Sequence, residues 1–261
     1  MALAMIVNVA FAALHNDALI NQELQAAAIA GDLAGTRHCI EAGADIQTTT
    51  IQGLYRHMVH KRRGWTPLHW AAKGGHAHVI RELVVRGANV FARDSVGNMP
   101  VHIVVSVPCF EHNEKRFIEC LQELNYVTKN KNNRHREVFV QNKIRGLVIN
   151  SQGTDNVTPL HLVAADGKVG MMRYLLQEGA GVHAYDSNGW TPLHSAAMAL
   201  KKGKEIIELL LAHGADKTKQ SYTGSTPAQI AIKAGASDLV PLLVRSSVRV
   251  AEQVAKRQRS R

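Results

Sequence analysis

The pentapeptide Trp65-Thr66-Pro67-Leu68-His69 recurs as Trp190-Thr191-Pro192-Leu193-His194 and, with valine first, as Val157-Thr158-Pro159-Leu160-His161. Two degenerate copies, Met99-Pro100-Val101-His102 and Thr226-Pro227-Ala228-Gln229, complete the series. The threonine position falls at 66, 99, 158, 191 and 226, so the spacings are 33, 59, 33 and 35 residues. Self-similarity at such a period predicts a solenoid of stacked repeats.

Each motif is followed by the same succession of sequence features. A small-residue helix is expected first, then a glycine, a second helix with paired aliphatic residues, and a Gly-Ala-x sequence. Threonine suits a helix N-cap, and proline suits the first helical position because its missing N–H would be unpaired there. Glycine supplies the left-handed residue at the end of the second helix. The Gly-Ala-x sequences are Gly43-Ala44-Asp45, Gly87-Ala88-Asn89, Gly179-Ala180-Gly181 and Gly214-Ala215-Asp216.

These motifs resemble the ankyrin-repeat family over residues 21–245. The resemblance implies an all-α solenoid of helix-turn-helix repeats with β-hairpin-like loops, in about six repeats including caps. The unit at about 21–47 lacks the motif and is expected to be the N-terminal cap, and the unit with Gln229 in place of the histidine is expected to be the C-terminal cap. The family typically binds proteins, so the resemblance also implies a non-enzymatic interaction module without cofactors.

The N-terminal segment bears on one border of this domain. Residues 2–14 are apolar apart from Asn8, which is compatible with a signal-peptide core, but they lack its positively charged start. We therefore predict an N-terminal capping helix over residues 1–20.

The third repeat departs from the pattern. In repeat three, Met99 replaces the N-cap threonine and Pro108 is expected to end the first helix early.

Bulk composition favours a cytoplasmic, monomeric protein. The three cysteines are sparse and odd in number, which fits a reducing compartment and no disulfide framework. No apolar run reaches the length of a membrane span.

Positive charge is concentrated outside the repeats. The net charge is +10, yet residues 46–63 contribute +4, residues 125–147 contribute +5 and residues 245–261 contribute +5, so the remaining 203 residues have a net charge of −4. The basic side chains that we single out are Arg62, Arg63, Arg134, Arg136, Arg257, Arg259 and Arg261.

The first two basic segments are insertions relative to the repeat. The step from Asp45 to Thr66 is 21 residues, where the equivalent steps elsewhere are 10, and the 59-residue spacing implies a longer insertion near residues 125–147. Insertions in repeat proteins emerge as loops, often on the binding face. Three interpretations remain open: docking of an acidic protein partner, contact with nucleic acid or anionic lipid, or simple solvation.

The basic tail at 246–261 has a distinctive spacing. Arg249 is followed after seven residues by Arg257, Arg259 and Arg261, and this R-x7-R-x-R-x-R pattern is similar to the C-terminal export signal of some bacterial type IV secretion substrates. The resemblance implies a virulence effector delivered into the cytosol or nucleus of a host cell. A plain basic helix end and a nuclear-import patch remain as alternatives.

The residues do not form a recognisable catalytic or metal site. Four of the 14 histidines are motif histidines, which in ankyrin folds hydrogen-bond within the turn and to the neighbouring repeat. The pairs His57-x-x-His60, His76-x-His78 and Cys109-x-x-His112 each offer two ligands, whereas structural zinc takes four. Cys39 and Cys120 are expected to be buried on second helices, which leaves Cys109 as the one nucleophile candidate.

A partner surface is expected on the hairpin tips and the concave face. The residue before the motif threonine lies near that surface, and tryptophan and arginine often dominate interface energetics. An alternative is that a tryptophan at this position packs on its own hairpin. The predicted partner-binding residues are Trp65, Trp70, Arg93, Tyr185, Trp190 and Tyr222.

Overall fold

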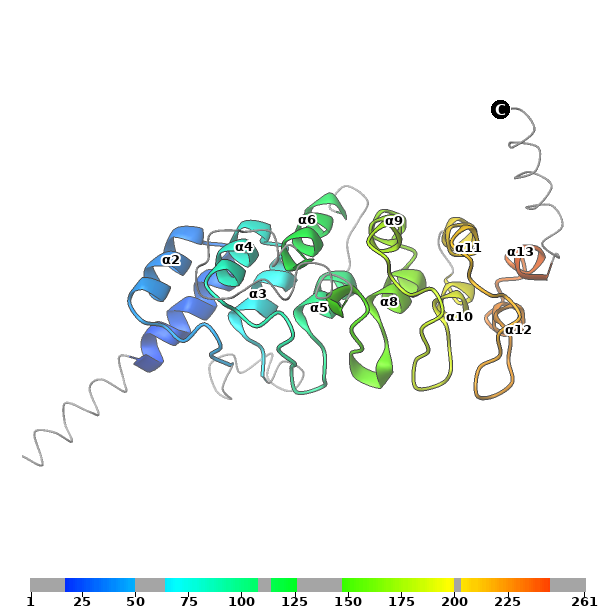
Figure 1. The fold of residues 1–261 in the computed structure, drawn as a ribbon, viewed down its shortest axis with the longest axis horizontal. Helices are drawn as coiled ribbons and strands as arrows, with labels where there is room; N and C mark the ends of the chain where they lie inside the picture. The colour runs from blue at the N-terminus through cyan, green and yellow to red at the C-terminus, as the bar shows by residue number, and fades with distance from the viewer. Residues whose placement is uncertain (1–16, 50–63, 108–113, 126–146, 200–202, 245–261) are drawn as a thin grey trace, which may run out of the picture.

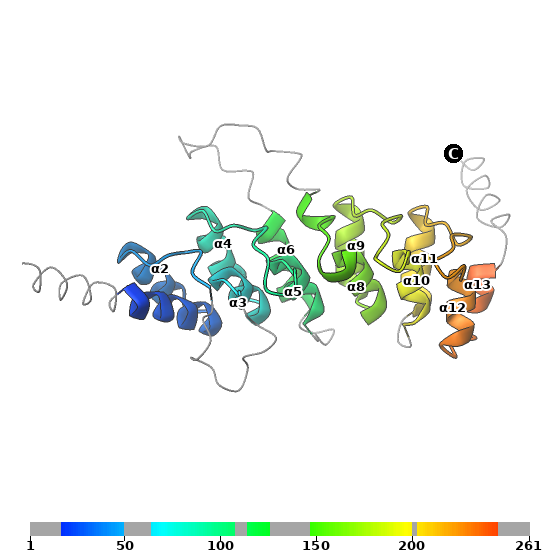
Figure 2. The same cartoon turned by 90° about the horizontal axis from the view of Figure 1, so that it is seen from below.

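The computed structural model describes residues 17–49, 64–107, 114–125, 147–199 and 203–244. The described elements are helices in two parallel rows, with loops projecting from the lower row (Figures 1 and 2). The first helices of the units are residues 17–30, α3 (Pro67–Gly74), α5 (Pro100–Ser106), α8 (Pro159–Asp166), α10 (Pro192–Ala197) and α12 (Pro227–Lys233). The second helices are α2 (Leu33–Glu41), α4 (Ala77–Val85), α6 (Glu114–Asn125), α9 (Val169–Gln177), α11 (Gly203–Ala212) and α13 (Val240–Val244).

The motif starts each first helix as its residue types predict. Thr66 has the extended backbone of an N-cap (φ −86°, ψ 166°), and Pro67 occupies the first turn. The same helix ends at Gly75, whose φ of 69° is left-handed. In repeat three, α5 ends at Ser106 ahead of Pro108, and Val107 is extended (ψ 128°).

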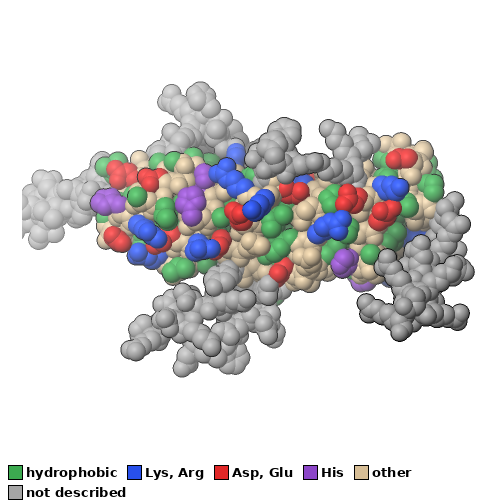
Figure 3. Space-filling view, turned by 90° about the horizontal axis from the view of Figure 1, so that it is seen from above, with side chains coloured by type: hydrophobic (Ala, Val, Ile, Leu, Met, Phe, Trp, Pro, Cys, Tyr) green, Lys and Arg blue, Asp and Glu red, His purple; other side chains and the backbone are tan. Residues whose placement is uncertain are grey.

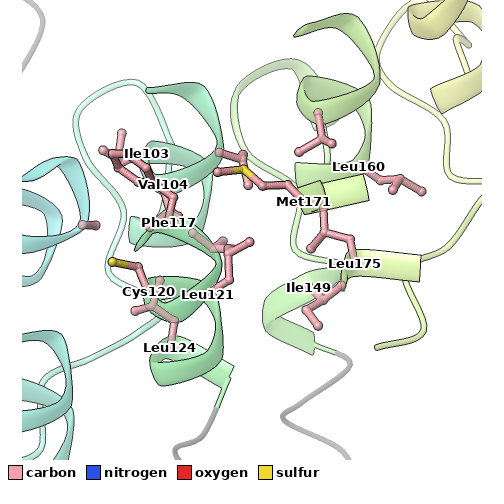
Figure 4. Packing of buried hydrophobic residues seen from close by; sticks show 14 of the residues in the cluster. Ile103, Val104, Phe117, Cys120, Leu121, Leu124, Ile149, Leu160, Met171 and Leu175 are labelled. Atoms are coloured by element: carbon pink, nitrogen blue, oxygen red, sulfur yellow. The ribbon is translucent and has the colours of Figure 1, made fainter. Parts of the chain in front are cut away.

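The core runs without interruption between the two rows of helices. It is made of aliphatic side chains that the pattern of the second helices predicts, together with alanines of the first helices that let the rows approach closely. Figure 4 shows Ile103 and Val104 of α5 near Phe117 of α6, with Met171 and Leu175 of α9 in the next unit. No unit buries its apolar face alone, so stability depends on the stacking of neighbours.

The outer surface of the second helices carries paired charges. Figure 3 shows basic and acidic side chains interspersed on this face. Ion pairs cross between successive helices at N–O distances of 2.5–3.0 Å, and most of their basic partners are exposed, so each contributes little to stability. These pairs are Arg37–Glu82, Arg81–Glu123 and Arg173–Glu205, and Arg86 also reaches Glu41 at 3.4 Å.

Basic side chains also join two of the units to the end of the preceding first helix. Arg116 Nε donates to the carbonyl of Gly75 at 2.7 Å. Lys168, although buried, donates from Nζ to the carbonyls of Val105 and Val107 (2.9 Å for Val107). Both satisfy carbonyl groups that have no partner inside their own helix.

Several expectations concern residues outside the described ranges. These are the N-terminal capping helix, apart from residues 17–20, and almost all of the insertions at 46–63 and 125–147 and of the tail at 246–261. Residues 17–30 form one helix, so the first described helix begins before the predicted domain border at residue 21. Among the described helices, none has the length and apolar character needed to cross a membrane.

Candidate partner-binding surface

Three of the described loops before the first helices are closed by buried acceptor side chains. Asp94 donates its N–H to the carbonyl of Asn98 (2.9 Å), and its Oδ1 accepts the N–H groups of Val96 (3.0 Å) and Asn98 (2.8 Å). Asp186 makes the same side-chain bonds to the amides two and four residues further on, both at 2.8 Å. In the last loop Ser221 takes this place, and its hydroxyl accepts the amide four residues on at 3.2 Å. The loops are therefore held in one shape before any partner binds.

The substitution Asp186→Ala should lower the free energy of unfolding by about 2 kcal/mol, because two backbone N–H groups lose their acceptor. Ser221→Ala removes one such bond and should cost about half as much. Urea unfolding of both variants would measure this. Equal costs would contradict the assigned role of the carboxylate.

The motif histidines join neighbouring loops. His161 Nδ1 receives bonds from the N–H (3.3 Å) and the hydroxyl (2.8 Å) of Thr158, and Nε2 contacts the carbonyl of Trp190 in the next unit at 2.9 Å. The same Nε2 contact recurs from His69 to Asn98 (3.2 Å), from His102 to Ser151 and Val157 (3.2 Å each), and from His194 to Ser225 (3.1 Å).

These contacts fix the protonation state of the rings. A backbone N–H can only donate and a carbonyl can only accept, so Nδ1 is bare and Nε2 carries the proton. Burial lowers the pKa of His69, His161 and His194, and lowers that of His102 to about 4, while the bonds to carbonyl groups oppose this effect. The predicted structural role of the motif histidines is confirmed.

Successive loop tips are hydrogen-bonded into a continuous ribbon. In each step, a donor of one loop reaches a carbonyl of the preceding loop. The bonds run from Thr154 Oγ1 to Val96 O (2.5 Å), from Ser187 N to Asp155 O (2.8 Å) and from Tyr222 N to Asn188 O (3.0 Å).

The structure places Trp65 and Trp70 inside the packed repeat. Each side chain is 5% exposed, and the two rings meet edge to face at 4.7 Å. The indole N–H of Trp65 donates to Asp94 Oδ2 in the next loop at 3.1 Å. Both tryptophans therefore support the neighbouring surface and present little area of their own.

The aromatic residues of the later units are more accessible. Tyr222 is 77% exposed and Tyr185 is 39% exposed, whereas Trp190 is partly buried and stacks on His194 at 6.3 Å. Met198, which directly follows α10, is 47% exposed and was not predicted from the sequence. Its position in the repeat was the signal available in the sequence. Met198 lies seven residues after Thr191, as Lys73 lies seven residues after Thr66.

Arg93 lies on this side of the molecule, but its side chain is bound to two loops rather than free for a partner. Its Nη1 donates to the carbonyls of Gly97 (2.7 Å) and Gln152 (2.8 Å), which bridges two loops. The other predicted basic residues, together with Cys109, lie outside the described ranges: Arg62, Arg63, Arg134, Arg136, Arg257, Arg259 and Arg261.

The described residues contain no group of three or more His, Cys, Asp or Glu side chains arranged to hold a metal ion. Cys39 and Cys120 are buried, as their positions on second helices predict. Burial raises the pKa of Cys120 to about 12, which disfavours the reactive thiolate.

Comparison with known proteins agrees with this geometry. Residues 118–221 match the family model for ankyrin repeats in three copies, and residues 63–95 match the model for a single ankyrin repeat. An ankyrin repeat domain of Acinetobacter baumannii has a similar structure, with a TM-score of 0.62, 21% identity, and coverage of 85% of this chain and 95% of that one.

Curated relatives match over shorter parts of their own length. The mouse B-cell lymphoma 3 protein homolog is 30% identical over 72% of this chain and 37% of its own length. A putative ankyrin repeat protein of Rickettsia bellii is 40% identical over 30% of this chain and 34% of its own length. The human ankyrin repeat and SOCS box protein 3 is 31% identical over 63% of this chain and 34% of its own length. This chain thus spans about a third of the length of these relatives.

Proposed function

Because the chain belongs to the ankyrin-repeat family, whose repeats are protein–protein interaction modules rather than enzymes, we propose that it binds a protein partner through the loops and first helices of its later units. The observation that carries this proposal is the exposure of Tyr185 and Tyr222 on loops held rigid by their own hydrogen bonds. Tyrosine offers a large contact area with a polar end and loses little conformational entropy on binding.

The neighbouring residues extend the same surface. The ring of Tyr222 lies over Gly189, which precedes the partly buried Trp190 in the sequence, and Met198 adds an adaptable apolar side chain. Rigid aromatic residues among adaptable ones are typical of binding hot spots. The partner surface therefore centres on the loops 185–190 and 221–225.

The double variant Tyr185→Ser/Tyr222→Ser should weaken partner binding at least about tenfold and shift the melting temperature little, because both side chains face solvent. Affinity capture from host-cell lysate would identify the retained protein, and titration of that purified protein would give the affinities. Val85→Ser, which alters an exposed apolar residue on the second-helix face, serves as the matched control. Unchanged affinity in the double variant would refute this surface.

We further propose that the chain acts as a bacterial effector inside a host cell. The spacing of Arg249, Arg257, Arg259 and Arg261 supports this, as does the similarity to the Rickettsia bellii protein. A translocation reporter fused to the last thirty or so residues should be exported, and replacement of the last three arginines by alanine should abolish export. Export that is indifferent to the arginines would remove this support.

Two other roles have their own support. The mouse and human relatives favour an endogenous intracellular scaffold or inhibitor. The basic segments favour an acidic partner or, as an alternative, nucleic acid or anionic membrane, and binding to nucleic acid would fall steeply with salt.

A further inference from the structure

The last described loop, residues 221–225, has no following loop in the described part of the chain. Each earlier pair of neighbouring loops is joined by recurring contacts. A donor of the following loop reaches a carbonyl of the preceding tip, and a motif histidine donates to a carbonyl of the following loop. In the last described unit, the tip carbonyl and the side-chain donor at the histidine position therefore have no such partner among the described residues.

In two of the described tips, the glycine is also closely covered by the next loop. A Cβ atom built on Gly64 would lie 3.3 Å from the backbone nitrogen of Ser95, and one on Gly189 would lie 2.7 Å from the ring of Tyr222. Gly224 occupies the same position in the last loop with φ of +73°, and no described atom lies within 4 Å of the corresponding point. Its face is open.

Gln229 keeps the hydrogen-bonding layout of the histidine it replaces. Its Oε1 accepts the N–H of Thr226 at 2.8 Å, as Nδ1 does in the other units. Its amide nitrogen therefore takes the place of Nε2 and carries donors toward the next position in the series. Within the described residues, neither this nitrogen nor the carbonyl of Thr223 has a hydrogen-bond partner.

The last described unit exposes apolar side chains on both of its helices, beside polar ones. Ile232 on α12 is 59% exposed and Val244 on α13 is 64% exposed. Terminal repeats normally present a polar outer face. This surface has the character of a seam between two units.

We propose that this end of the solenoid binds a β-turn of a partner protein. Continuity with the loop–loop seams defines the ligand. In the last two loops, the residue that donates its N–H to the preceding tip lies three positions before the carbonyl that receives the histidine, as with Tyr222 and Ser225. The partner must therefore offer a four-residue turn whose first N–H donates to Thr223 O and whose fourth carbonyl accepts from Gln229 Nε2.

The geometry also specifies the residues of that turn. Glycine is favoured at the third position, because Gly189 and Gly224 have positive φ there. The first side chain of the turn would lie over Gly224, as the Tyr222 ring lies over Gly189, so a flat aromatic residue fits best. This site adjoins the proposed partner surface at the loop 221–225, but Tyr185 is not part of it, so its test does not depend on that residue.

The probe is a backbone-cyclised peptide with the sequence of residues 220–226, which already serves as such a turn within the chain. Titrated into the isotope-labelled full-length protein, it should shift the NMR signals of Gly224 and of the Gln229 side-chain amide, with a dissociation constant of about 1 mM. Absence of saturable shifts would overturn the proposal.

Matched variants isolate the donor. Gln229→Glu keeps the acceptor for the N–H of Thr226 but removes both N–H donors, and should weaken peptide binding at least about tenfold. Gln229→His restores the motif donor and should bind within about threefold of the parent protein. Equal binding by the Glu variant would overturn the proposal.

Two further measurements distinguish this site from the surface around Tyr185 and from self-association. Tyr185→Ser should leave peptide binding unchanged, so that loss of the partner surface and loss of this site can be told apart. Sedimentation of the parent protein should show a monomer. A dimer that Gln229→Glu dissociates would assign the site to a second copy of this chain and overturn the partner proposal.

Discussion

Acidification from about pH 7 to about pH 4 is expected to lower the free energy of unfolding by at least about 3 kcal/mol. The unfolded chain binds protons at its histidines near the ordinary value of 6.5, whereas burial holds the pKa of His102 at about 4 in the folded chain. Stability is therefore full above about pH 6.5 and falls as the pH drops toward about 4, below which His102 contributes no further loss. The lowered pKa values of His69, His161 and His194 act in the same direction.

Urea unfolding at a series of pH values would measure this dependence. His102→Gln should flatten the curve, because a glutamine can accept the N–H of Met99 and donate to the next loop without titrating, as Gln229 shows for the acceptor half. Val85→Ser, which changes an exposed residue without removing a titratable group, serves as the control and should keep the shape of the parent curve. A parent curve that is flat between pH 7 and pH 4 would contradict the assigned tautomers.

Truncation of Trp65 to alanine should cost about 4 kcal/mol of unfolding free energy. The side chain is almost fully buried, packs against Trp70 and His69, and donates its indole N–H to Asp94. The substitution leaves a cavity and removes one partner of a buried carboxylate. Thermal and urea unfolding would both report the loss.

Trp190 provides a matched comparison at the same repeat position. It is partly buried, stacks on His194 and makes no indole hydrogen bond to another described residue. Trp190→Ala should therefore cost less than half as much as Trp65→Ala. Trp65→Phe, which keeps the ring contacts but removes the N–H donor, should fall between them. Equal losses at the two tryptophans would show that repeat position alone decides their role.

Much of this architecture follows from residue chemistry within a single repeat. The Thr-Pro pair predicts where each first helix begins, and the 33-residue step predicts the register in which the units stack. The role of His161 was predictable because its partners, Thr158 and the next loop, recur with the motif. Burial of Cys120 follows from its place on the apolar face of α6.

The roles of the tryptophans depend on neighbours that the motif does not specify. Four residues after the threonine, the chain has Trp70 in one unit and Ser195 in another. The large ring packs on Trp65, whereas the small serine provides no such partner for Trp190. The residue at this position could therefore have predicted that Trp65 is more deeply buried than Trp190. The carboxylate of Asp94 was missed because it acts across a repeat border, on the indole of the preceding unit.

The motif histidines donate in one direction along the loop edge, from each unit to the one that follows it. A ribosome releases the chain in that same order, so every unit leaves the exit tunnel before the carbonyl that its histidine needs. The Thr–His bonds can close each new helix at once, while the link onward waits for the next stretch of chain. When a nascent chain pauses between two units, the newest motif histidine is therefore the one whose Nε2–H still lacks its acceptor, however many units have already formed.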